Sequence, residues 1–238
     1  MTNDIDPAEE LEVRALRDDL WSFPIHDPPA RASGLRTHGF ALLAGAESVL
    51  VDTVCEHHRP ALRRLKDEGP RPVALVLTHR HLLGVGDGLA RIEEELGIPV
   101  FLHPLDAAHP RARAAEIRFH DPMDSALLSG LGVEVDHFPG HTAGHVLLRW
   151  RAHGGILFVG DCALGPTMRQ ARAGVERIVR PHLSVSDDDA QLRRSWESFD
   201  KPAESLLPLH GEVILDRPDL RSLLAPLRRP ESTPEPAG

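Results

Sequence analysis

The chain has 238 residues, of which 41% are hydrophobic and 26% are charged, a composition typical of folded globular proteins. Its formal net charge of −9 argues against a general nucleic-acid binder, and two cysteines cannot build a disulfide framework. Fifteen histidines stand out, because imidazole is the commonest metal ligand among side chains. Their positions relative to the predicted elements decide whether they form a site.

Both ends of the chain are polar. Residues 1–19 are acidic and lack the pattern of a signal peptide, and no apolar run is long enough to predict a transmembrane helix. Residues 229–238 are rich in Pro and Glu and are expected to form a disordered tail. We expect residues 20–228 to fold as one domain of a cytoplasmic protein that binds neither membranes nor nucleic acid.

Short apolar runs alternate with amphipathic segments along the predicted domain. Such runs are typical of buried strands, and they lie at residues 40–43, 48–51, 73–77, 100–102, 133–138, 146–150, 156–159 and 205–207. Helical spacing of apolar residues, with caps and stops, predicts helices at residues 58–68, 88–96, 187–199 and 220–227. This alternation predicts an α/β fold in which helices flank sheets.

Metal-ligating residue types follow four of the predicted strands. His79 and His81 follow one strand, and residues i and i+2 of an extended segment project to the same side, so both can reach one ion. His141, Asp161 and His210 each follow another strand. A single histidine at a strand end is usually a solvated loop residue, so the set carries the argument. Three imidazoles and a carboxylate suit a zinc-type ion.

At these residues the sequence resembles the metallo-β-lactamase fold superfamily. The matches occur in the family's order and span residues 52–211, and they are Asp52 in VLVDT, Thr78-His79-Arg80-His81, Pro139-Gly140-His141-Thr142 with Gly144-His145, Gly160-Asp161 and His210-Gly211. The resemblance implies a four-layer αββα sandwich with a metal site at one edge, between two sheets.

Two residues of the family's motif T-H-x-H-x-D-H are absent, because Leu83 and Gly84 stand where the family has Asp and His. The resemblance assigns the first metal ion to three histidines that are all present: His79, His81 and His141. It assigns the second ion to the two missing residues and His210, with Asp161 between the ions. Since zinc sites use three or four protein ligands, the resemblance implies one zinc-type ion, with iron as the alternative, and a lost second site.

Three functions agree with this incomplete motif. The first is a mononuclear hydrolase of a small ester, thioester or amide, in which Asp161 orients water and His210 binds substrate or stabilises the developing oxyanion. The second is a non-haem iron enzyme that resembles persulfide dioxygenases, with His79, His141 and Asp161 as ligands. The third is an inactive ligand-binding member. Each implies a small-molecule partner, and because many members pair, the resemblance suggests a homodimer.

Further residues are expected to support the site. Asp52 is expected to hydrogen-bond the loop of His79, and Arg80 to point away from the ion. His145 is expected to pack nearby without binding metal, and Cys162 to be a small buried hydrophobe.

The remaining candidates lie at the edge of the predicted site. We expect His57 and His58 to be mainly solvated and His103 to approach the site from the side. Residues 162–186 are expected to cover the cleft. Four arginines of that segment are solvated or bind an anionic substrate: Arg169, Arg172, Arg177 and Arg180.

Overall fold

A computed structural model describes residues 12–85 and 88–229. Seven strands form the first sheet, in chain order: β1 (Arg14–Arg17), β2 (Leu20–Ile25), β3 (Thr37–Ala44), β4 (Glu47–Val51), β5 (Arg71–Val76), β6 (Val100–Phe101) and β7 (Phe119–His120). Neighbours from β1 to β4 pair antiparallel, and those from β4 to β7 pair parallel. The parallel half directs the end of β5, where His79 follows, toward one edge of the sheet.

Four strands form the second sheet, in the order β11-β10-β9-β8: β8 (Val133–His137), β9 (Val146–Trp150), β10 (Ile156–Gly160) and β11 (Ser205–Pro208). The pairs β8·β9 and β9·β10 are antiparallel, and β10·β11 is parallel. Because β10 and β11 run parallel, Asp161 and His210, which follow them, emerge at the same edge.

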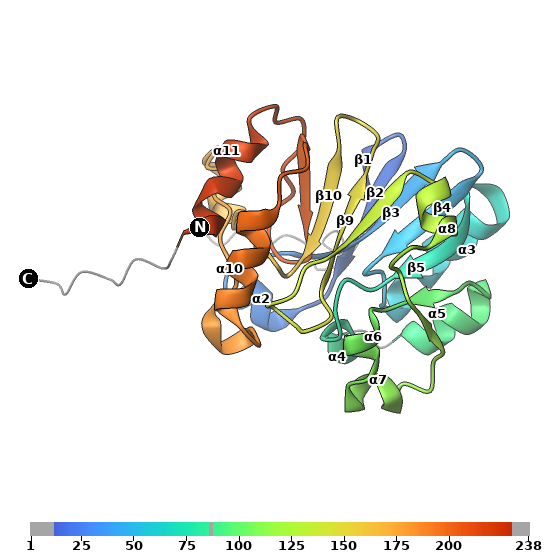
Figure 1. The fold of residues 1–238 in the computed structure, drawn as a ribbon. Coiled ribbons are helices and arrows are strands. Elements are labelled where there is room, and N and C mark those ends of the chain that lie inside the picture. The colour runs from blue at the N-terminus through green and yellow to red at the C-terminus, as the bar shows by residue number, and fades with distance from the viewer. Residues whose placement is uncertain (1–11, 86–87, 230–238) are drawn as a thin grey trace, which may run out of the picture.

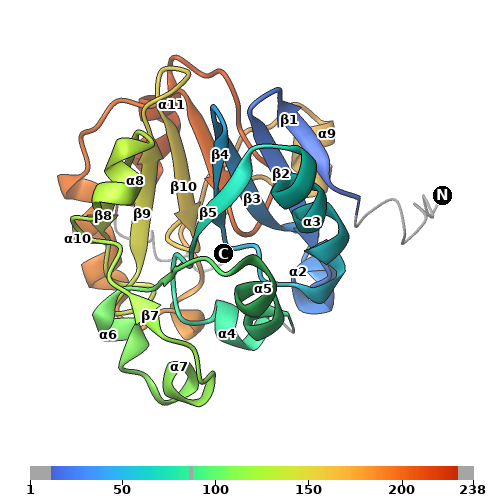
Figure 2. The same ribbon diagram turned by 90° about the vertical axis from the view of Figure 1, so that its right-hand side faces the viewer.

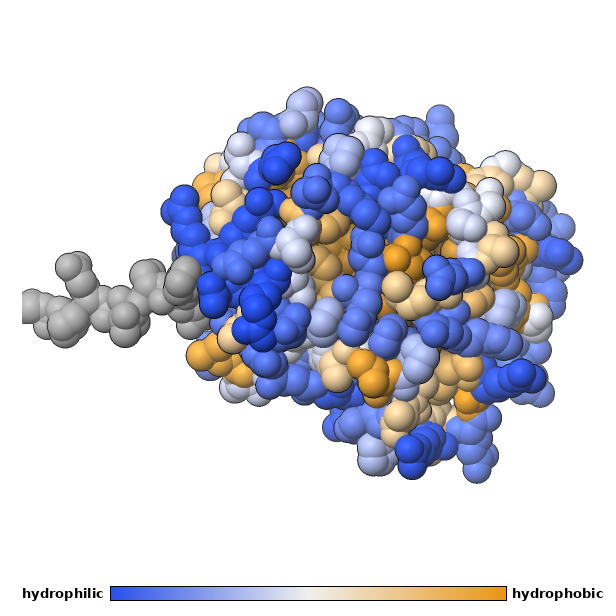
Figure 3. Space-filling model, in the orientation of Figure 1, coloured by the Kyte–Doolittle hydropathy of each residue, from blue (hydrophilic) through white to orange (hydrophobic). Residues whose placement is uncertain are grey.

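The two sheets pack face to face on an apolar core. Phe40 of β3 meets Phe158 of β10 edge to face, with 5.7 Å between ring centroids. Val76 and Leu207 are fully buried in the same cluster. Burial of such side chains supplies most of the favourable free energy of folding. On the face drawn in Figure 3, hydrophilic side chains surround scattered hydrophobic ones.

Helices cover the outer face of each sheet. The first sheet is covered by α3 (Arg59–Glu68) and α5 (Leu89–Leu96), and the second by α10 (Asp189–Ser198) and α11 (Leu220–Leu224), as Figures 1 and 2 show. Leu62 and Leu65 of α3 face the sheet, and Gly97 ends α5 in the left-handed conformation that favours glycine. The order helix, sheet, sheet, helix confirms the predicted αββα sandwich.

Shorter helices lie in the connections. They are α2 (Pro28–Ala32), α4 (Leu82–Val85), α6 (Pro104–Ala107), α7 (Pro110–Ala114), α8 (Ala126–Gly130) and α9 (Met168–Arg172), with 3₁₀ turns at Glu56–His58, Leu183–Val185 and Ala225–Arg228. None of the helices in the described residues is long and apolar enough to span a membrane.

The two ends of the chain lie partly outside the described residues. β1 falls within residues 1–19, which the sequence separates from the domain, and it pairs with β2 through Ala15 and Trp21. Residues 230–238, nearly all of the predicted tail, are not among the described residues.

Candidate metal centre

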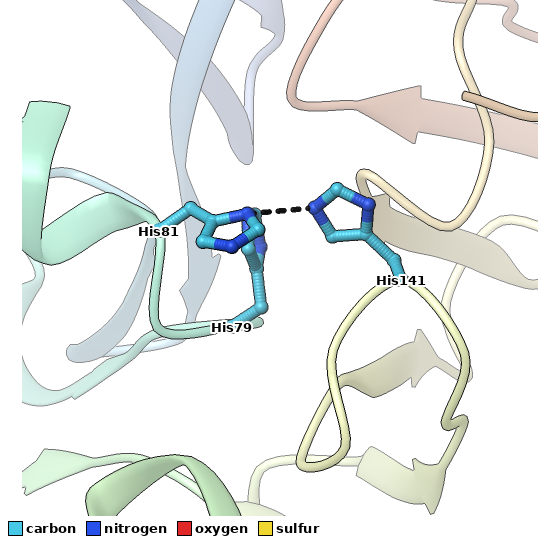
Figure 4. Close-up of side chains that lie close together, drawn as sticks. All are labelled: His79, His81 and His141. Atoms are coloured by element: carbon cyan, nitrogen blue, oxygen red, sulfur yellow. Dashed lines mark hydrogen bonds between the residues drawn. The ribbon is translucent and has the colours of Figure 1, made fainter. Parts of the chain in front are cut away.

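Three histidines from two loops converge at one edge of the sandwich. His79 and His81 follow β5, and His141 lies between β8 and β9. One ring nitrogen of each lies within 4.8 Å of the others, and Nδ1 of His81 is 3.0 Å from Nε2 of His141 (Figure 4). The structure therefore brings together the residues that the sequence assigns to the first ion.

Asp161 faces the same cluster from the end of β10. Its Oδ2 lies 3.5 Å from Nε2 of His79 and 3.7 Å from Nε2 of His141. Its Oδ1 accepts a hydrogen bond from Nδ1 of His210, at 2.6 Å. All five sequence-predicted site residues thus form one continuous group, with the carboxylate of Asp161 between His79 and His210.

Two of the cluster histidines, His81 and His141, are neutral, and their facing nitrogens share one hydrogen bond. Burial, followed by the charge of neighbouring His79, lowers the pKa of His81 to about 4 and that of His141 to about 3. Nε2 of His79 is buried and has no hydrogen-bond partner within the described residues. Because metal ligation needs neutral imidazoles with free lone pairs, this donor set fits a zinc-type ion.

Asp52 fixes the loop that carries His79. Its Oδ1 accepts a hydrogen bond from the backbone N of Thr78 and its Oδ2 one from the Thr78 hydroxyl, both at 2.8 Å. Because this hydroxyl donates to Asp52, its oxygen, 3.1 Å from Nδ1 of His79, is placed to accept a hydrogen bond from that nitrogen. The predicted contact of Asp52 with this loop is confirmed.

Three small or buried neighbours lie beside the cluster: His145, Gly160 and Cys162. The ring of His145 packs on that of His79, with 5.3 Å between centroids, as the sequence predicts. Gly160 has a φ of +49°, and a Cβ there would lie 2.4 Å from the Thr78 hydroxyl oxygen and 2.8 Å from Nε2 of His145. Only glycine fits this position. Cys162 is fully buried, as predicted, and burial raises the pKa of its thiol.

Arg80 points away from the cluster, as the alternation predicts. Its guanidinium contacts Asp106 at 2.9 Å and Asp187 at 2.7 Å. Burial would raise the pKa of Asp106, but hydrogen bonds from Thr142, Arg80 and Gly144 lower it below its usual range. The sequence reasoning missed both carboxylates, because nothing in the local sequence links either one to residue 80.

The half of the site where the family motif is incomplete has a different structure. Leu83 packs against the apolar cluster beneath α5. Gly84 is exposed, and a Cβ there would lie 3.2 Å from Nη1 of Arg111. Neither position offers a ligand atom to a metal ion.

His210, the remaining histidine of that half, is bracketed by carboxylates. Its Nε2 lies 3.1 Å from Oδ2 of Asp27, and its Nδ1 contacts Asp161. Burial would lower the pKa of His210, but the two carboxylates raise it to about 10. Asp27 also caps α2 through the backbone N of Ala30. Sequence reasoning missed its contact with His210, although Asp27-Pro28 is a recognisable helix start.

A cavity adjoins this second half of the site, which comprises Leu83, Gly84 and His210; the first half comprises His79, His81 and His141. It has a volume of about 750 Å³, and its wall includes Ile25, Asp27, Leu35, Thr37 and Met168. The wall is mainly apolar, which is typical of small-molecule sites. Since Asp27 contacts His210 and His210 contacts Asp161, these three side chains lie between the cavity and the histidine cluster.

Three expectations at the edge of the site need correction. His58 is buried rather than solvated, with Nε2 2.8 Å from the carbonyl oxygen of Pro24. His103 caps α6 and stacks on His137, with 4.3 Å between centroids, instead of approaching the cluster. Arg180 is not available to an anionic substrate, because it pairs with Asp189 and with backbone carbonyls near the end of the domain.

Comparisons with known sequences identify relatives of this chain. An uncharacterized protein of Mycobacterium tuberculosis is 28% identical over 191 residues, which cover 67% of this chain and 84% of that protein. A hydroxyacylglutathione hydrolase of Anaeromyxobacter dehalogenans is 34% identical over 136 residues, or 55% of this chain and 48% of the enzyme.

Solved structures share the fold. A metallo-β-lactamase from Hirschia baltica matches with a TM-score of 0.64 at 20% identity, over 93% of this chain and 99% of that one. A protein solved in a di-iron-bound form matches with a TM-score of 0.54 at 26% identity, over 84% and 97% of the two chains. The sequence model of the metallo-beta-lactamase superfamily matches residues 37–229. Because this match covers most of the chain and contains the whole histidine cluster, the chain belongs to the metallo-beta-lactamase superfamily, whose members bind metal ions.

Proposed function

We propose that this protein is a hydrolase with a single zinc-type ion, held by three histidines, that cleaves a small ester, thioester or amide. The ligands are His79, His81 and His141. Asp161 is not a ligand in this proposal; it faces the open fourth position. The observation that carries this proposal is the convergence of three imidazole nitrogens within 4.8 Å, one of them buried without a hydrogen-bond partner in the described chain. Three protein ligands and an open position are typical of catalytic zinc sites.

The second half of the site supports one ion rather than two. Leu83 and Gly84 supply no ligand atoms, and both nitrogens of His210 have carboxylate partners. With a pKa of about 10, the ring is protonated at neutral pH and has no lone pair for a metal. Our proposal therefore keeps His210 among the catalytic residues and removes it from the predicted ligand set.

The bound ion, Asp161 and His210 would each have one role in the reaction. A bound zinc-type ion lowers the pKa of a coordinated water toward about 7 and polarises a carbonyl group. Asp161 is ionised, and its Oδ2 faces His79 and His141, where it orients a water by accepting a hydrogen bond. The positive charge of His210 keeps Asp161 ionised and stabilises negative charge that develops on the substrate.

The proposed substrate class rests on a sequence relative and on the cavity. The relative from Anaeromyxobacter dehalogenans is named a hydroxyacylglutathione hydrolase, which favours hydrolysis of an acyl group. The cavity beside Asp27, with its mainly apolar wall, would take the apolar part of a small acyl compound.

Iron is the second candidate metal. The structural relative solved in a di-iron-bound form favours it, and two histidines with one carboxylate suit non-haem iron. In that case His79, His141 and Asp161 would hold the ion, and the substrate would be a persulfide.

Metal analysis combined with turnover tests the proposal. We expect about one zinc ion per chain, and hydrolysis of 4-nitrophenyl acetate or of a thioester that a chelator abolishes and added zinc restores. Iron with oxygen consumption on a persulfide would replace this function by the second candidate. A folded protein with neither metal nor turnover would identify an inactive binding member.

A further inference from the structure

One buried carboxylate joins the two loops that carry the histidine cluster. Asp106, in α6, has no exposed surface and accepts four hydrogen bonds. Its Oδ1 accepts from Nη1 of Arg80 and from the backbone N of Gly144, both at 2.9 Å. Its Oδ2 accepts from the backbone N of Arg80 at 2.9 Å and from the hydroxyl of Thr142 at 2.7 Å. Each oxygen therefore holds one donor from each loop.

The donors stand next to the cluster histidines in the sequence. Arg80 lies between His79 and His81, and Thr142 directly follows His141. A Cβ at Gly144 would lie 2.6 Å from the backbone N of Asp106 and 2.8 Å from its Cγ. The small residue at 144 thus permits the close approach of the second loop to Asp106.

An exposed carboxylate makes a second, outer link between the same loops. Asp187 accepts from the Arg80 guanidinium at 2.7 Å and from the backbone N of Ala143 at 3.1 Å. Its own backbone N donates to the carbonyl oxygen of His141 at 3.0 Å. Arg80 therefore lies between an inner carboxylate that is buried and an outer one that is 42% exposed.

We propose that Asp106 is the positioning residue that sets the separation of His81 and His141. This inference rests on the proposed metal site. A shift of either loop breaks two hydrogen bonds to a buried carboxylate, and water cannot replace them there. The 3.0 Å approach of His81 to His141 is thus maintained before any ion arrives, which is the preorganisation that a tight metal site requires.

Asn cannot replace Asp106 in this role. Both carboxylate oxygens face N–H or O–H donors, and an amide NH₂ would put donor against donor. We expect Asp106→Asn to raise the dissociation constant for Zn²⁺ about tenfold to a hundredfold and to alter the visible spectrum of the Co²⁺-loaded protein. Leu62→Ala is the matched control, because it removes buried apolar contacts of α3 and none of the hydrogen bonds to Asp106. We expect it to lower stability and leave Zn²⁺ affinity unchanged.

A second pair of variants keeps the test decisive if Asp106→Asn does not fold. Thr142→Val removes the hydroxyl that donates to Asp106, whereas Thr142→Ser keeps it. We expect Thr142→Val to weaken Zn²⁺ binding and Thr142→Ser to restore most of it. Unchanged Zn²⁺ affinity and an unchanged Co²⁺ spectrum in Thr142→Val would overturn the proposal, as would equal losses in Leu62→Ala.

Measurements on the metal-free chain separate this inference from the proposed function. We expect the ring-proton NMR signals of His81 and His141 to be sharp in the natural chain and shifted or broadened in Thr142→Val, but not in Thr142→Ser. If the natural chain binds no Zn²⁺, the proposed function fails and these signals alone decide the positioning role. Identical His81 and His141 signals in all three proteins would refute it.

Discussion

The two halves of the site use the same residue types in opposite ways. In the first half, the carboxylate of Asp52 contacts His79 only through the hydroxyl of Thr78. In the second half, carboxylates contact the histidine directly: Asp27 and Asp161 bracket His210. In the first half, the lowered pKa values of His81 and His141 favour neutral rings, whereas in the second half the pKa of His210 is raised to about 10, which favours a charged ring.

In our proposal, this difference removes His210 from the ligand set although it occupies a family ligand position. His210 occupies such a position and lies 2.6 Å from Asp161, yet its second nitrogen faces Asp27 instead of an open space. A carboxylate in direct contact favours the protonated imidazole, and a protonated imidazole cannot bind a metal. In the proposed site, the number of ions per chain therefore depends on Asp27 as well as on Leu83 and Gly84.

The largest expected effect is the loss of the first half. We expect His79→Ala to weaken Zn²⁺ binding more than about a hundredfold, because it removes a ligand rather than a supporting contact. Zinc per chain after dialysis, measured by elemental mass spectrometry, is the readout. His153→Ala is the control, because His153 pairs with Asp19 on the surface. Unchanged zinc content in His79→Ala would contradict the site assignment.

Rebuilding the second half is expected to need three changes rather than two. The variant Leu83→Asp/Gly84→His restores the missing ligands, but Nε2 of His210 still faces the carboxylate of Asp27. We expect a second Zn²⁺ to bind tightly only when Asp27→Asn is added, with stoichiometry read by titration calorimetry. Two ions per chain in the double variant alone would show that Asp27 does not block the site.

Much of the fold is predictable from sequence, and the exceptions have physical reasons. β10 is a fully buried apolar run and β5 ends in one, whereas β1 is a polar edge strand. β2 contains Pro24, which weakens a strand prediction. β7 has only two residues, too few for a periodic pattern.

The histidine cluster was predictable, but the residues that hold it in place were not. His79 and His141 lie in motifs with fixed spacing, while Asp27 is 183 positions from His210 and Asp106 is 36 from Thr142. A single sequence carries no signal for such long-range contacts. One clue was available: His-Pro at residues 103–104 marks the start of α6, the helix that contains Asp106.

The charge of His210 predicts how the stability of the metal-free protein depends on pH. Its pKa is about 10 in the folded chain and about 6.5 in an unfolded one. The contribution of protonated His210 to the free energy of unfolding is therefore fully present below pH 6.5 and is lost as the pH rises toward 10.

Removing one of the two carboxylates should shorten that pH range. We expect Asp27→Asn to lower the pKa of His210. The stability that protonated His210 contributes is then lost at a pH about one unit lower than in the natural chain. Urea unfolding between pH 6 and pH 10, in the presence of chelator, measures both proteins. Identical profiles would mean that Asp161 alone sets the charge of His210.

The smallest expected effect is at the outer face of the first half. The hydroxyl of Ser186 lies 3.4 Å from Nδ1 of His141, a long hydrogen bond that water can replace. We therefore expect Ser186→Ala to change the dissociation constant for Zn²⁺ less than about threefold, by competition against a chromophoric chelator. A loss as large as that of Asp106→Asn would mean that contacts at the ring, and not the buried link between the loops, hold His141 in place.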